Sequence, residues 1–109
     1  MPRTFIQLFL TCSDIAQADN IAAVLLNEHL IACAKTAPVT SSFYWEEKIN
    51  HDSEILLVMG SADDLFDEVD AKVSSLHSYD IINLQAITSS HVSKQTLSWL
   101  NETLKNGKQ

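Results

Sequence analysis

The chain has 109 residues, of which 46% are hydrophobic, and its formal net charge at pH 7 is −7. This length predicts a single domain, residues 1–109, with one modest core. Arg3 is the only arginine, and the absence of a basic stripe excludes proteins that track nucleic-acid phosphates and argues against binding to anionic membranes.

The first predicted element is a strand, because residues 5–10 form a mostly apolar run of the kind found at the centre of a sheet. The run is too short and interrupted for a signal peptide or a membrane span. The two cysteines, Cys12 and Cys33, suit a reducing compartment with free thiols, so we expect a cytoplasmic protein. A bridge between the two cysteines cannot be argued from their spacing.

A helix follows this strand. Asp14, with Gln17 three residues later, forms a capping-box pattern, and apolar residues then recur at helical spacing up to Leu30. Two strand-like segments come next, residues 31–45 and 49–59, and they predict a β-hairpin that turns near residues 46–48. Pro38 lacks a backbone donor and indicates an edge strand.

The second half repeats this order. Gly60 and Ser61 are expected to end the hairpin, and Ser61 with Asp64 resembles a capping box for a second helix. Residues 82–88 alternate apolar and polar side chains, which predicts a half-exposed strand. A third helix is expected after His91, ending at Asn106-Gly107.

The order β-α-β-β-α-β plus a C-terminal helix predicts an α+β fold, the ferredoxin-like sandwich, with helices on one face of a four-stranded antiparallel sheet. The apolar run at residues 55–59 indicates that another copy of the chain covers the other face. Twelve hairpin residues span roughly 40 Å, so the hairpin should project. We expect its aromatic residues Phe43, Tyr44 and Trp45 to contact other subunits.

His77 is the main candidate for a metal ligand, in a loop with Tyr79 and Asp80, because imidazole binds Zn(II) and Cu(II). It supplies only one ligand, so further ligands would have to come from neighbouring subunits. Cys12, before a helix, is a second candidate if the helix N-terminus lowers its pKa, and the alternative is a packed thiol. The acids at residues 63–70 fit a solvated helix face.

Five motifs, in the same order and spacing, resemble the CutA divalent-cation tolerance proteins. They are Ile31-Ala32-Cys33-Ala34-Lys35, Phe43-Tyr44-Trp45-Glu46-Glu47-Lys48-Ile49, Ser53-Glu54-Ile55-Leu56, His77-Ser78-Tyr79 and Leu97-Ser98-Trp99-Leu100. The resemblance implies a ferredoxin-like homotrimer with paired hairpins and a role in tolerance of copper and other divalent metals. It implies no enzymatic activity and no obligatory cofactor, with Cu(II) or Zn(II) as the metal a site would take.

The chain also departs from this family. Glutamate replaces the hairpin glycine, Ser78 replaces the proline of the "HPY" motif, and Leu76-His77 replaces a pair of histidines. The fold should survive these changes, whereas a copper site copied from the family should not. The resemblance also implies an intersubunit pocket that contains Glu54, Tyr79 and Lys48. It does not identify the ligand of this pocket.

Three hypotheses follow. The first is a trimeric, non-enzymatic protein of metal tolerance that binds Cu(II) or Zn(II) weakly through His77, together with Cys12 or acidic groups. The alternative is a trimeric regulator that binds a small molecule between subunits, similar to the nitrogen-regulatory trimers. A hydrolase using Glu54, Tyr79 and His77 is disfavoured, because the chain has neither an arginine cradle nor a glycine-rich phosphate loop.

Overall fold

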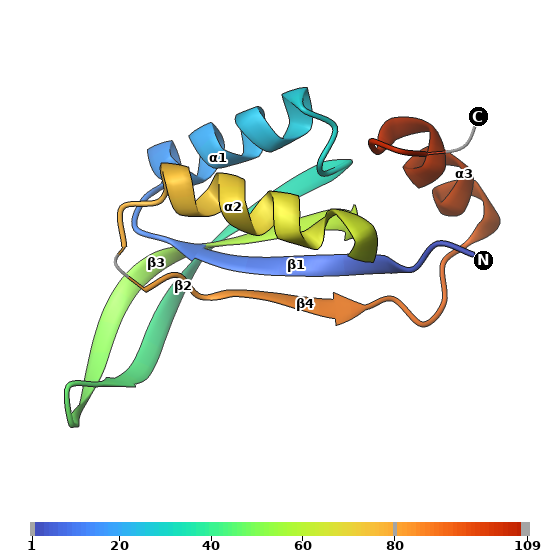
Figure 1. Cartoon of the computed structure of the whole chain (residues 1–109). Helices are drawn as coiled ribbons and strands as arrows, with labels where there is room; N and C mark the ends of the chain where they lie inside the picture. The colour runs from blue at the N-terminus through green and yellow to red at the C-terminus, as the bar shows by residue number, and fades with distance from the viewer. Residues whose placement is uncertain (1, 80, 108–109) are drawn as a thin grey trace.

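In the computed structural model, residues 2–79 and 81–107 are described, and they form a four-stranded sheet with three α-helices (Figure 1). The elements, in chain order, are β1 Phe5–Cys12, α1 Ile15–Asn27, β2 Cys33–Trp45, β3 Lys48–Ala62, a 3-10 turn Asp63–Leu65, α2 Phe66–Leu76, β4 Leu84–Thr88 and α3 Lys94–Thr103. The strand order is β2-β3-β1-β4, and every neighbouring pair is antiparallel. The predicted ferredoxin-like α+β fold is therefore confirmed.

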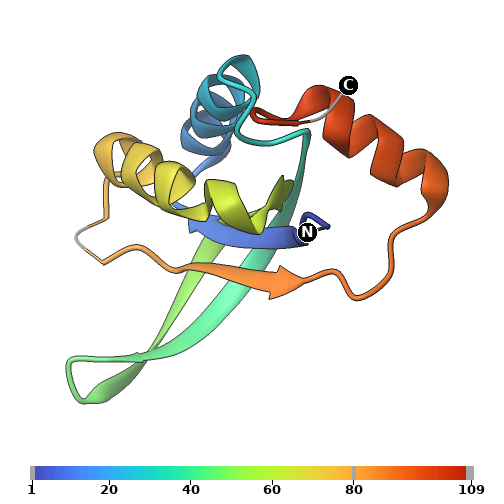
Figure 2. The same cartoon turned by 45° about the vertical axis from the view of Figure 1, so that its right-hand side comes forward.

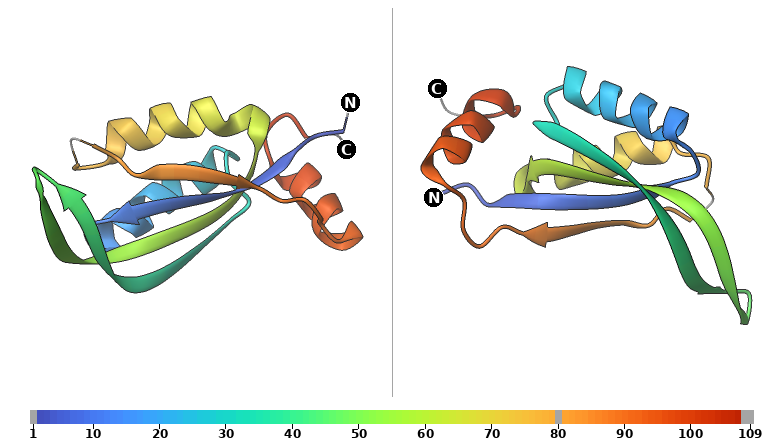
Figure 3. Two further views of the ribbon diagram at one scale, coloured as in Figure 1. Left: turned by 90° about the horizontal axis from the view of Figure 1, so that it is seen from below. Right: turned by 180° about the vertical axis from the view of Figure 1, so that it is seen from behind.

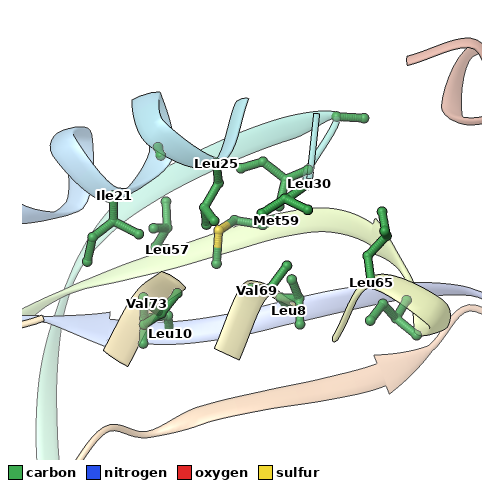
Figure 4. Close-up of a cluster of buried hydrophobic side chains, with 14 of the residues drawn as sticks. Leu8, Leu10, Ile21, Leu25, Leu30, Leu57, Met59, Leu65, Val69 and Val73 are labelled. Atoms are coloured by element: carbon green, nitrogen blue, oxygen red, sulfur yellow. The ribbon is translucent and has the colours of Figure 1, made fainter. Parts of the chain in front are cut away.

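The hydrophobic core lies between the sheet and the two helices α1 and α2, which cover the same face (Figures 1 and 4). Leu8 and Leu10 of β1 stand opposite Met59 and Leu57 of β3, and all four side chains are fully buried. Figure 4 shows the residues from α1 and α2 that point onto this layer, Ile21, Leu25, Val69 and Val73. Burial of these aliphatic side chains is the main favourable term in the fold.

The opposite face of the sheet carries neither α1 nor α2. Side chains alternate between the faces of a strand, so Phe9 of β1 and its register partner Val58 point away from the core. Phe9, Val58 and Leu56 are only half-buried, and Ile87 of β4 is 60% exposed. α3 reaches only one end of this side, where Leu100 packs beside Gly60, and we call the remaining surface the helix-free face. Within one chain the apolar run 55–59 is fully buried only on the helix side, so the expected covering of the other side by a second copy stays a prediction.

The hairpin of β2 and β3 extends well beyond the rest of the sheet (Figure 3). β3 pairs with β1 only from Ile55 onward, whereas it pairs with β2 from Lys48 to Gly60. The turn residues Glu46 and Glu47 have φ angles of 51° and 65°, the left-handed region that favours glycine. The side-chain amide of Asn50 donates hydrogen bonds to the carbonyls of Trp45 and Lys48, which holds the turn closed.

Two predicted boundaries are wrong. β3 continues through Gly60 and Ser61 to Ala62, because these residues pair with the first residues of β1. Ser61 is buried, and its hydroxyl donates a 2.7 Å hydrogen bond to the carbonyl of Leu30 instead of capping a helix. α2 begins at Phe66 without a side-chain cap. The predicted cap of α1 is confirmed: Asp14 accepts a 2.8 Å hydrogen bond from the backbone of Gln17.

α3 lies at the end of the sheet away from the hairpin tip (Figure 2). Its N-cap is Ser93, two residues after the predicted start, and Asn106 beyond its end has a φ of 64°. Arg3 fixes this end of the molecule, since its guanidinium binds Asp64 at 2.7 Å and the carbonyl of Lys105 at 2.6 Å. In the part of the chain that the structure describes, no helix has the length and apolar character needed to cross a membrane.

Candidate functional site

A cleft of about 770 Å³ lies at the base of the hairpin. The register places Thr11, Ser41, Asp52 and Glu54 on the helix-free side of their strands, and the loop after α2 forms the other wall. We call it the acidic cleft, and its lining residues are Thr11, Ser41, Ser42, Phe43, Trp45, Asn50, Asp52, Glu54, Ser78, Tyr79, Ile81 and Asn83. Clefts of this volume are typical of small-molecule sites.

Glu54 and Tyr79, two of the residues expected in an intersubunit pocket, meet in this cleft within one chain. The Tyr79 hydroxyl donates a 2.7 Å hydrogen bond to Oε2 of Glu54. Glu54 is only 9% exposed, which is unusual for a carboxylate and normally requires a partner. Burial and the neighbouring Glu54 carboxylate raise the pKa of the Tyr79 phenol, so Tyr79 stays a neutral donor.

His77 lies beside the cleft but both of its ring nitrogens are engaged. Nε2 donates a 2.8 Å hydrogen bond to the carbonyl of Thr11, and Nδ1 accepts a 3.1 Å hydrogen bond from the backbone of Tyr79. The ring also packs on that of Tyr79, with centroids 4.6 Å apart. His77 thus holds the loop against β1, and a metal would have to displace one of these bonds. Asp80, grouped with His77 in the sequence, lies outside the described residues.

Cys12 is fully buried at the end of β1, on the helix side of the sheet. Burial, and secondarily the charges of Asp14 and Glu54, raise the pKa of its thiol to about 11. Of the two alternatives for Cys12, a lowered pKa and a packed thiol, the packed thiol is the one that this burial supports. Cys33 is half-buried at the start of β2, and both cysteines are free.

The hairpin residues divide between the cleft and the tip. Phe43 and Trp45 line the cleft, while Tyr44 is 73% exposed on the other side of β2. Lys48 pairs with Trp45 at the turn, six residues from Glu54, which is about 20 Å along the strand. Within one chain Lys48 therefore does not share the cleft with Glu54 and Tyr79.

Asp52 also lines the cleft, although its place just after the hairpin tip favours a solvated surface side chain on sequence alone. It lies two residues before Glu54, and the alternation of the strand puts both carboxylates on the same face. That i, i+2 spacing was the available signal. Over residues 2–79 and 81–107, however, no group of three or more His, Cys, Asp or Glu side chains comes together as a metal site. A strong divalent-metal site would need more ligands than one chain supplies here.

Comparison with known proteins gives one consistent result. The family model "CutA1 divalent ion tolerance protein" matches residues 6–103. The divalent-cation tolerance protein CutA of Pyrococcus horikoshii is 32% identical over 98 residues, which are 90% of this chain and 96% of the relative.

Solved structures agree with this match. The crystal structure of CutA1 from Oryza sativa superimposes with a TM-score of 0.91 at 25% identity, covering 94% of this chain and 95% of the other. The Archaeoglobus fulgidus protein, described as a periplasmic divalent cation tolerance protein CutA, gives a TM-score of 0.88 at 32% identity and covers 95% and 100%. The family match over nearly the whole chain and the shared fold together place this chain in the CutA1 divalent ion tolerance protein family.

Proposed function

We propose that the protein acts in divalent-cation tolerance as a non-enzymatic homotrimer that binds divalent metal weakly in its acidic cleft. The observation that carries this proposal is the pair of carboxylates, Asp52 and Glu54, on one face of β3 in a cleft whose described lining residues include no basic side chain. Carboxylates attract divalent cations, and a two-carboxylate set from one chain accounts for weak binding.

The trimer is supported by surface that one chain leaves open. The helix-free face exposes parts of Phe9, Leu56, Val58 and Ile87, and the hairpin exposes Tyr44 and Ile49, which lie outside the acidic cleft. Monomeric proteins rarely leave a contiguous apolar patch of this kind uncovered. Two further copies of the chain, each covering part of a neighbouring sheet, would bury it.

The metal proposal is tested by calorimetric titration with Zn(II) and Cu(II). Weak binding by the wild type and reduced binding by D52N and E54Q are expected, because each change removes one charged ligand. E102Q, which changes an exposed carboxylate on α3, is the matched control. Isotherms of D52N and E54Q identical to the wild type would remove the acidic cleft from metal binding.

The same titration tests His77 and Cys12, the ligands expected from the sequence. His77 would have to release Thr11 or Tyr79, and Cys12 would have to lose the proton that burial retains. Reduced metal binding by H77A or C12S would assign the residue as a ligand.

A small-molecule regulator is the second candidate function, and the volume of the cleft favours it. A space of about 770 Å³ is far larger than one metal ion requires and lies in the range of small-ligand sites. A thermal-shift comparison separates the two, since only a ligand that binds the folded state raises the melting temperature.

For either function we propose the cytoplasm as the compartment, supported by the two free thiols. The Archaeoglobus relative is described as periplasmic, so cell fractionation is the appropriate check.

A further inference from the structure

The lining of the acidic cleft combines negative charge with aromatic surface. Asp52 and Glu54 supply two carboxylates, and Phe43, Trp45 and Tyr79 supply three rings. The remaining lining side chains are hydroxyls, amides and one isoleucine, and none of the described lining residues is Lys, Arg or His. An anionic ligand would meet only like charge here, so this lining selects for a cation.

Glu54 provides a specific acceptor. Its Oε2 accepts the hydrogen bond from Tyr79, whereas Oε1 receives none from the residues that the structure describes. Among the described residues, the only buried side-chain polar atom without a partner belongs to Arg3, so Oε1 of Glu54 is open to the cleft and available to a ligand. A donor that enters the cleft with a positive charge would form a charge-assisted hydrogen bond with Oε1, the stronger kind.

The rings around this carboxylate indicate the rest of the ligand. Aromatic faces attract ammonium groups and also cover apolar carbon. Phe43 and Trp45 of β2 pair with Asn50 and Lys48 of β3. These partners lie an even number of positions from Asp52 and Glu54, and every second side chain of a strand lies on the same face. The two rings and the two carboxylates therefore project on the same side of the hairpin. A bare metal ion would leave most of the cleft empty, whereas an organic ammonium ion satisfies the charge and contacts the rings.

We propose that the acidic cleft binds a small organic ammonium ion, a protonated primary amine with an apolar body. Its nitrogen donates to Glu54 beside the charge of Asp52, and its apolar body lies against Phe43 and Trp45. This inference rests on the proposed function in one respect: the cleft must stay open to solvent in the homotrimer. The amine and a divalent metal would then bind to the same two carboxylates, Asp52 and Glu54.

Trp45 allows a direct test. The chain has two tryptophans, so W99F leaves Trp45, in the cleft, as the only one. Titration of this variant with benzylammonium chloride should change the tryptophan fluorescence in a saturable way. Benzyl alcohol and benzoate, which share the ring but are neutral and anionic, should produce no saturable change.

Charge variants in the W99F background complete the test. E54Q should weaken benzylammonium binding by about tenfold or more, because it removes a charge-assisted bond. D52N should weaken it by a smaller factor and replaces E54Q if that variant does not fold. E102Q, on α3, should bind like the parent. Equal binding of benzyl alcohol and benzylammonium, or unchanged binding by both cleft variants, would overturn the inference.

Light scattering and metal titration on the same samples distinguish this inference from the proposed function. A W99F trimer that binds Zn(II) but does not respond to benzylammonium would disprove the amine site and leave the proposed function standing. Saturable benzylammonium binding without any metal binding would support the amine site and contradict metal binding. If E54Q instead dissociated the trimer and the parent bound no amine, a neighbouring subunit would fill the cleft and the inference would be wrong.

Discussion

The hydroxyl of Tyr79 donates a 2.7 Å hydrogen bond to Oε2 of Glu54 and so joins the loop after α2 to the middle of β3. The two residues are 25 positions apart in the chain. Their contact closes one wall of the acidic cleft and satisfies one oxygen of a buried carboxylate. The stability of the loop and the shape of the cleft therefore depend on the same bond.

Replacing Tyr79 with phenylalanine should lower the free energy of unfolding by about 1–3 kcal/mol, since it leaves a buried carboxylate without its donor. Urea unfolding measures this change. Y44F is the control: Tyr44 is 73% exposed and its hydroxyl makes only a 3.3 Å contact, with the carbonyl of Glu47. Equal stability of Y79F and Y44F would show that the bond contributes nothing measurable.

Placing a charge on the helix-free face should dissociate the proposed trimer. V58D puts a carboxylate at the centre of this face, where its burial between subunits would be costly, while the core on the other side of β3 is untouched. Light scattering should report three times the chain mass for the wild type and one chain mass for V58D. L26D, an equivalent change at an exposed position on α1, should keep the wild-type mass. A wild type that is monomeric at micromolar concentration would contradict the assembly.

The hairpin turn should be open to stabilisation. Glu47 adopts a φ of 65°, where a side chain costs about 1 kcal/mol that glycine does not incur. E47G should therefore raise the free energy of unfolding by up to about 1 kcal/mol, measured as a shift of the urea midpoint. E47A removes the same charge but keeps Cβ, so it should not stabilise the protein. A gain in E47A equal to that in E47G would assign the effect to charge and not to backbone strain.

Stability should fall at alkaline pH because of Cys12. Its pKa is raised from 9.0 to about 11 in the folded chain, so the unfolded chain releases this proton first as the pH rises. The contribution of the protonated Cys12 thiol to the free energy of unfolding is complete below pH 9.0, and it is lost as the pH rises to about 11. Over that window, one such group lowers the unfolding free energy by at most about 1.4 kcal/mol per pH unit.

C12A should flatten this alkaline slope, even if its stability at neutral pH is lower because the core loses a buried side chain. C33A retains Cys12 and should keep the wild-type slope. Urea unfolding over a series of pH values gives both slopes, and parallel curves for C12A and the wild type would refute the assigned role.

The elements of the fold were predictable because local rules agree with the tertiary structure. The Asp14 cap and the apolar spacing of α1 are satisfied within a few residues of chain. The end of β3 was not predictable, because Gly60 and Ser61 are poor strand residues and only their pairing with β1 makes them one. Tertiary pairing overrode local preference at that point.

The candidate site, like the fold, was predictable from the sequence only in part. Glu54 and Tyr79 were found through the family motifs, but their hydrogen bond joins distant segments and no periodicity reveals it. The engagement of both His77 nitrogens and the raised pKa of Cys12 depend on packing and burial, which a sequence does not show. Asp52 was predictable from its spacing to Glu54.

From Glu54 to its tip the hairpin has no third strand beside it in the described chain, since β1 pairs with β3 no further than Ile55, and the Tyr79 hydrogen bond holds it only at its base. A two-stranded ribbon is marginally stable in water. Amide protons of residues 40–53 should then exchange with deuterium long before those of β1, through local opening that leaves the core intact. Neighbouring chains that pack against the hairpin would slow this exchange. The exchange rate measured at several protein concentrations would therefore report the fraction of chains that are monomeric.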